Sequence, residues 1–191
     1  MDIKLTQIYK SYKGVPILED VNILFEEGET TCIMGPSGIG KTTLIRILTG
    51  LTKADRGIIQ GMDGRKVAVV FQEDALIDHW DALRNVELVC EPSITKEMIE
   101  DEFFKLGLRN YKNKAVSQLS GGMRRRVAIL RALMADSDFI VMDEPFSALD
   151  EDSKIRVIEY IKKKTKEKTL VVVTHDKEDV QRLGGNMVLL T

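Results

Sequence analysis

The segment from Gly35 to Thr42 has the sequence Gly-Pro-Ser-Gly-Ile-Gly-Lys-Thr and matches the spacing G-x-x-x-x-G-K-[ST]. Glycines at these positions let backbone amides approach phosphate oxygens closely, and a helix that follows adds its positive end. Lys41 supplies a positive charge for the terminal phosphates, and the Thr42 hydroxyl can ligate Mg²⁺. The pattern therefore predicts a site for the phosphates of a nucleotide, formed by Gly35, Ser37, Gly38, Ile39, Gly40, Lys41, Thr42 and Thr43.

Two adjacent acids follow the apolar run from Phe139 to Met142. Because successive side chains of a strand point in opposite directions, Asp143 and Glu144 are expected to have different roles. Asp143 is predicted to share Mg²⁺ with Thr42, and Glu144 is predicted to be the base that orients and polarises an attacking water. The acid pair and the phosphate loop together indicate hydrolysis of a nucleoside triphosphate.

Apolar spacing predicts the elements that position these side chains. Residues 2–34 carry alternating apolar residues around a turn near Lys13–Gly14 and are expected to form an antiparallel ribbon. Unbroken apolar runs are typical of strands covered on both faces in a parallel sheet, and they occur at 31–34, 67–71, 139–142 and 170–173. Apolar faces at helical spacing, which include Leu51 and Met98, predict helices at 43–51, 97–106 and 123–135.

The composition is that of one globular domain. The chain has 191 residues, of which 43% are hydrophobic and 30% charged, and a net charge of -2 gives no support for binding nucleic acid. Cys32 and Cys90 are too few for a disulfide framework and lack metal-ligand spacing. The start lacks a signal-peptide core, and no run approaches the roughly 20 apolar residues that cross a bilayer. We therefore expect a cytoplasmic protein whose membrane work, if any, needs another polypeptide.

The segment from Leu119 to Met123 resembles the LSGGQ signature of ATP-binding-cassette transporters, and it opens a helix whose free amides suit an anion. Nearly the whole chain resembles the ATP-binding subunit of such a transporter. In that family the signature of one subunit holds the γ-phosphate bound by the opposite subunit, so the resemblance implies that Ser120, Gly121 and Gly122 act across a dimer interface. Met123 replaces the signature glutamine, as also occurs in importers of oxyanion or sulfonate type.

Four more positions match motifs of the same family. Tyr12 stands where an aromatic side chain stacks on adenine, and Gln72 where a glutamine contacts Mg²⁺ or the attacking water. Asp150 ends the loop through which the two subunits communicate, and His175 matches the switch histidine that contacts the γ-phosphate. The segment from Thr52 to Val67 is short for the family, which implies a trimmed strand ribbon beneath the adenine.

The resemblance implies an α/β fold with a P-loop NTPase core, a mostly parallel sheet, an N-terminal antiparallel β ribbon and an inserted helical subdomain. Residues 1–191 would form a single, minimal cassette domain. The nucleotide-binding core would comprise 1–72 and 136–191, and the helical subdomain 73–135. ATP and Mg²⁺ are the implied cofactors, and the implied partners are a second cassette subunit, identical or homologous, and a separate transmembrane permease. Such a subunit lies in the cytoplasm, at the inner face of the membrane.

Two other classes stay open at this point. A non-transport ABC ATPase would share every motif, although repair types carry long insertions between phosphate loop and signature, and translation types join two cassettes in one chain. A small phosphotransferase would use the phosphate loop alone. That class leaves Ser120, Gly122 and His175 without a role, so the transporter subunit is the interpretation that accounts for most of the chain.

Overall fold

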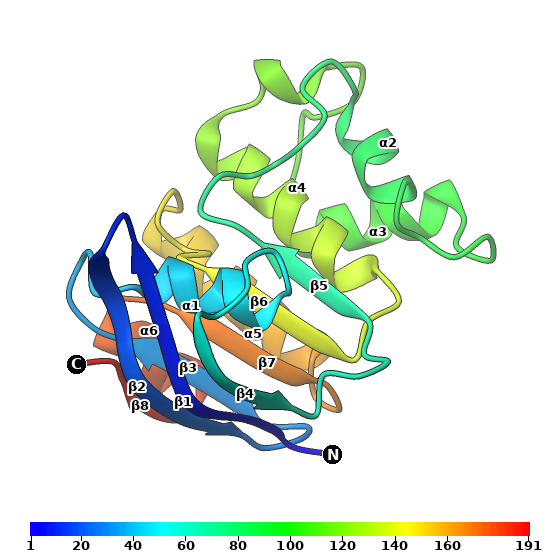
Figure 1. The fold of residues 1–191 in the computed structure, drawn as a ribbon. Coiled ribbons are helices and arrows are strands. Elements are labelled where there is room, and N and C mark those ends of the chain that lie inside the picture. Colours follow the sequence, from blue (N-terminus) through cyan, green and yellow to red (C-terminus); the bar gives the residue numbers. More distant parts are fainter.

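The computed structural model describes residues 1–191 (Figure 1). The phosphate loop directly follows one strand of a five-stranded parallel sheet. All four neighbouring pairs in the order β5-β6-β7-β3-β8 run parallel. The strands are β3 (Thr30–Met34), β5 (Val67–Val70), β6 (Phe139–Asp143), β7 (Thr169–Val173) and β8 (Asn186–Leu189). Every residue of β6 and β7 is buried, as the unbroken apolar runs predict. The carboxyl ends of β3, β6 and β7 therefore meet at one edge of the sheet.

A second sheet is antiparallel and has the order β2-β1-β4. Its strands are β1 (Ile3–Tyr12), β2 (Val15–Phe25) and β4 (Arg56–Gln60). Helix α1 (Lys41–Leu48) lies between this sheet and the parallel sheet (Figure 1), because its buried face shares one apolar core with side chains of both sheets. The predicted ribbon over residues 2–34 is confirmed for β1 and β2, with the turn at Lys13–Gly14.

Three helices gather at one end of the parallel sheet and form the green part of Figure 1: α2 (Ala82–Glu87), α3 (Lys96–Lys105) and α4 (Gly121–Met134). Helix α4 runs back along β5, so the larger apolar core is continuous from the helices into the sheet. Helix α5 (Glu151–Lys164) follows β6, and helix α6 (Lys177–Leu183) follows β7; the two helices pack against each other, and β8 is the last element. This arrangement agrees with a helical insertion, and the boundaries proposed for it, 73–135, stay a prediction.

Several local predictions need correction. Helix α1 ends at Leu48, and Leu51 is 62% exposed beyond it, so Leu51 does not belong to the buried face. Met98 is 48% exposed because the buried face of α3 consists of Ile99 and Phe103. Strand β4 pairs with β1 and gives the ribbon a third strand, and the trimming expected between Thr52 and Val67 stays a prediction. No helix has both the length and the apolar character that crossing a bilayer demands.

Candidate functional site

The phosphate loop is a tight turn between β3 and α1. Gly40 has a φ of 103°, and a β-carbon there would lie 2.7 Å from a methyl of Leu18 and 2.9 Å from the carbonyl oxygen of Ile17. Only glycine fits this position, because both the backbone conformation and the packing exclude a side chain. The Lys41 ammonium donates to the carbonyl oxygens of Gly35 and Pro36, at 2.7 and 3.0 Å. The loop thus holds a cation and a helix start at the carboxyl end of β3.

Thr42 and Asp143 meet across 101 residues of sequence. The Thr42 hydroxyl donates to Oδ2 of Asp143 at 2.8 Å, and Asp143 is 2% exposed at the end of β6. Burial raises the pKa of Asp143, while the Thr42 hydroxyl and the charges of Arg125 and Lys41 act in the opposite direction. A hydroxyl beside a buried carboxylate fits Mg²⁺, which takes hard oxygen ligands from one or two carboxylates together with substrate phosphates.

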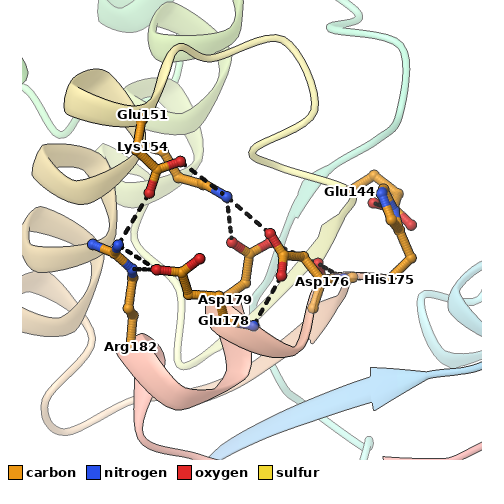
Figure 2. Close-up of polar contacts among 9 residues, drawn as sticks. Glu144, Glu151, Lys154, His175, Asp176, Glu178, Asp179 and Arg182 are labelled. Carbon is orange, nitrogen blue, oxygen red and sulfur yellow. Dashed lines mark hydrogen bonds and ion pairs between the residues drawn. The ribbon is translucent and has the colours of Figure 1, made fainter.

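Glu144 contacts His175 at the ends of neighbouring strands. Oε2 of Glu144 lies 2.8 Å from Nδ1 of His175, which is the pair at the right of Figure 2. Glu144 follows β6 with a φ of 48°, and its N–H donates to the carbonyl oxygen of Val173 at 2.9 Å. Glu144 therefore lies one residue beyond β6 in a left-handed conformation, so strand alternation does not describe it. The two acids make different polar contacts, and their separate roles stay a prediction.

A cavity of about 350 Å³ brings most of the predicted residues together. A second hollow of about 400 Å³ adjoins it and shares Thr42, Gln72 and Asp143 with it. The predicted residues that line the first cavity are Tyr12, Ser37, Gly38, Gly40, Lys41, Thr42, Thr43, Gln72, Asp143 and Glu144. Gly35 and Ile39 do not line this cavity. A β-carbon on Gly35 would lie 2.6 Å from the carbonyl oxygen of Leu190. The cavity therefore joins an aromatic ring, a phosphate loop, a hydroxyl–carboxylate pair and a second carboxylate.

The signature residues lie elsewhere on the same chain. Neither Ser120, Gly121, Gly122 nor Asp150 lines the cavity at the phosphate loop. The Ser120 hydroxyl caps α4 by accepting from the Met123 N–H at 3.3 Å. A β-carbon on Gly122 would lie 2.9 Å from the carbonyl oxygen of Ala148, so the start of α4 packs against the loop that ends at Asp150. One chain thus carries both the candidate phosphate site and a separate helix start whose first residues, Ser120 and Gly121, are exposed.

Arg125 is a buried residue of this region that the sequence did not single out. Its guanidinium donates to the carbonyl oxygens of residues 143–145 at 2.6, 2.8 and 3.0 Å, and to the carbonyl oxygen of Phe71. It also pairs with Asp74 at 3.3 Å and is 1% exposed. Burial lowers the pKa of Arg125, and the Asp74 carboxylate opposes that shift. One side chain of α4 therefore holds the backbone at both Gln72 and Glu144.

Comparison with known proteins shows what the chain is similar to. A family model described as "ABC transporter" matches residues 18–147. An aliphatic sulfonates import ATP-binding protein of Rhodococcus jostii is 33% identical over 99% of this chain and 79% of its own length. The taurine import ATP-binding protein of Escherichia coli O157:H7 is 33% identical over the same shares. A sulfate/thiosulfate import ATP-binding protein of Synechocystis is 34% identical, and the chain spans 58% of its length.

Solved structures agree with the sequence relatives. The dimeric bacterial ABC transporter cassette MJ0796 superimposes with a TM-score of 0.87 at 32% identity, over 98% of this chain and 94% of that one. The same cassette in a post-hydrolysis state, bound to ADP and Pi, gives a TM-score of 0.86 at 31% identity, over 99% and 94% of the two chains. The predicted resemblance is confirmed, and this chain belongs to the ABC transporter family as one of its ATP-binding cassettes.

Proposed function

We propose that two copies of this chain close around two Mg-ATP molecules, hydrolyse ATP and thereby drive import through a separate membrane permease. The observation that carries this proposal is a pair of contacts at the carboxyl ends of neighbouring strands, Thr42 with Asp143 and Glu144 with His175. Thr42, Asp143 and Glu144 line one cavity, and His175 reaches it through its contact with Glu144. As an ABC cassette the chain is an ATPase. The relatives described above are named import proteins, which supports import as the direction.

The phosphates of ATP are bound by the amides of residues 37–43 and by Lys41, with the adenine against Tyr12. Thr42, Asp143 and Gln72 are the residues that would hold Mg²⁺, which when bound neutralises charge on the β- and γ-phosphate oxygens. The raised pKa of buried Asp143 supports this role, because a nearby cation offsets the cost of keeping that carboxylate charged.

Glu144 orients the attacking water and accepts its proton. Its side chain is 17% exposed, and the side chain of His175, which contacts it, is 71% exposed and would meet the γ-phosphate of bound ATP. The contact at 2.8 Å lets the histidine hold the carboxylate in one orientation until nucleotide arrives. Gln72 borders the same cavity and adds an amide at the edge of the water position.

The second half of the site comes from the opposite copy. Ser120, Gly121 and Gly122 form the start of a 14-residue helix, whose free N–H groups suit the γ-phosphate oxygens of a neighbour. Asp150 lies beside this helix start and takes part in the same interface. Because one chain carries both halves, two identical copies can complete each other, which supports a homodimer. The dimeric form of the cassette MJ0796 is consistent with that arrangement.

The permease supplies the membrane-spanning part, and this chain lies at the inner face of the membrane through it. Co-purification with a transmembrane protein from the native membrane tests this partnership. Recovery of nothing but non-membrane partners would contradict the transporter assignment and favour a non-transport ABC ATPase.

Hydrolysis and dimer formation are tested together by Glu144→Gln. The amide keeps the shape of the side chain but cannot accept a proton, so we expect ATP to bind while kcat falls by about 100-fold or more. With excess Mg-ATP this variant should elute as a dimer in size-exclusion chromatography. Glu159→Gln removes an exposed carboxylate from α5 and is the control, which should hydrolyse ATP like the parent. A Glu144→Gln variant that keeps full turnover would refute the assigned base.

A further inference from the structure

Lys154 lies within a group of carboxylates next to the candidate site. It belongs to the first turn of α5, and its ammonium lies 3.0 Å from Oδ2 of Asp176 and 3.1 Å from Oδ1 of Asp179, with Glu151 at 3.5 Å (Figure 2). The Lys154 side chain is 13% exposed and that of Asp179 is 4% exposed. The hydrogen bond to Asp176 is the main reason that the pKa of Lys154 is raised. The ammonium is therefore charged and held in place at neutral pH.

One of the two closest carboxylates belongs to Asp176, the residue after His175, and the other contacts Thr174, the residue before it. Oδ2 of Asp179 accepts from the Thr174 hydroxyl at 2.7 Å, and that hydroxyl accepts from the Asp176 N–H at 3.1 Å. Lys154 is the only cation within ion-pair distance of Asp176 or Asp179. The residue before His175 and the residue after it are thus fixed by one group of contacts, centred on a lysine from another helix.

The backbone of Lys154 contacts the loop that faces the proposed dimer partner. Its N–H donates to the carbonyl oxygen of Asp150 at 2.8 Å, and the Asp150 side chain caps α5 through the Ser153 N–H at 2.9 Å. Movement of the loop at Asp150 would move the first turn of α5 and with it the ammonium of Lys154. The same ammonium contacts the segment that carries His175.

We propose that Lys154 is a positioning residue for hydrolysis, which links the dimer-facing loop at Asp150 to the orientation of His175 through Asp176 and Asp179. The proposal rests on the roles of Glu144 and His175 given under the proposed function. Lys154 does not touch the phosphate cavity, so it acts through His175 and leaves nucleotide binding to the phosphate loop.

The alternative is a purely structural contact that fastens α6 to α5. Both readings predict a loss of stability when the lysine is removed, so stability alone does not separate them. A double-mutant cycle does separate them, because residues that act through one another are non-additive, whereas independent residues add.

The experiment measures kcat and KM for ATP hydrolysis by the full chain in four forms: parent, Lys154→Met, His175→Ala and the double variant. We expect Lys154→Met to lower kcat by roughly 10-fold with KM for ATP nearly unchanged, within the range that coupled neighbours show. In the His175→Ala background the same substitution should change kcat by less than about 2-fold. Lys154→Arg keeps the charge near both carboxylates and should restore much of the activity.

Two further variants keep the test decisive. Asp176→Asn keeps the side-chain oxygen that caps the Glu178 N–H but loses the charge, and it should lower kcat in the same His175-dependent way even if Lys154→Met unfolds. Lys163→Met changes an exposed lysine on the same helix that forms no ion pair, and it should leave kcat unaltered.

An equal effect of Lys154→Met in both backgrounds, with His175→Ala itself impaired, would overturn the positioning role and leave the proposed function intact. A normal kcat in His175→Ala would instead overturn the assignment of His175, and the inference for Lys154 would fall with it.

Discussion

Arg125→Met should destabilise this protein more than the same substitution of its half-exposed neighbour Arg124 on α4. The guanidinium donates to buried and half-buried carbonyl oxygens, those of Phe71, Gln72 and residues 143–145, and pairs with Asp74. Methionine fills similar space but donates no hydrogen bond, so the carbonyl oxygens lose this donor and Asp74 keeps only its ion pair with Arg124.

The magnitude follows from two opposing contributions. Each hydrogen bond from a charged donor contributes about 1.5–3 kcal/mol, and the burial cost of the guanidinium, several kcal/mol, disappears with the charge. Removing one member of a buried charged group costs about 3–5 kcal/mol in net terms. We therefore expect the free energy of unfolding to fall by about 3–5 kcal/mol, out of a typical total of about 5–15 kcal/mol.

Urea unfolding measures this loss, and kcat for ATP hydrolysis should fall as well because Gln72 and Glu144 lose their common anchor. Arg124→Met is the matched control on the same helix. Arg124 is 26% exposed, pairs with Asp74 at 3.5 Å and Asp78 at 2.9 Å, and donates to the carbonyl oxygen of Val116 at 3.3 Å. Its loss should cost about 1–2 kcal/mol, less than the loss of Arg125. Equal losses for the two variants, or a loss below about 1 kcal/mol for Arg125→Met, would refute the reasoning.

Three other substitutions test the site. Lys41→Ala should weaken ATP binding by about 10- to 100-fold, because a charged contact to phosphate is lost, and isothermal titration that gives an unchanged Kd would contradict the assigned loop. Asp143→Asn should raise the Tm of the nucleotide-free protein at pH 7 by a few degrees, and the gain should vanish in acid. Burial raises the folded pKa of Asp143, so its cost to stability is absent below the ordinary value of 3.8 and fully present above the folded pKa. Gly122→Ala adds a carbon 2.9 Å from the Ala148 carbonyl oxygen and should impair ATP-driven dimer formation in light scattering, and a normal dimer would show that the interface does not need this close approach.

Much of the site could be predicted from the sequence because its parts are local in the chain. The phosphate loop, the acid pair after β6 and the start of α4 each depend on a few consecutive residues whose spacing fixes their geometry. Once three parallel strands are expected, their carboxyl ends must meet at one edge, which brings Thr42, Asp143 and Glu144 together.

The residues that were missed depend on tertiary contacts. Arg125 stands in a run of three arginines on α4, and nothing in that run shows that the middle one is buried. Strand β8 is short and mostly exposed, and only its pairing with β3 defines it. The turn at Glu144 has a φ of 48°, which a glutamate adopts because its N–H is bound to Val173 across the sheet.

The two-chain nucleotide site is tested most directly by cross-linking between differently marked copies. One Glu144→Gln, Cys90→Ser sample would carry Ser37→Cys in the phosphate loop, and a second would carry Ser120→Cys at the start of α4. With Mg-ATP and a short bifunctional thiol reagent, the mixture should give a covalent dimer that joins position 37 of one copy to position 120 of the other, and omission of nucleotide should abolish it. Absence of that cross-link in the ATP-saturated mixture would contradict the account.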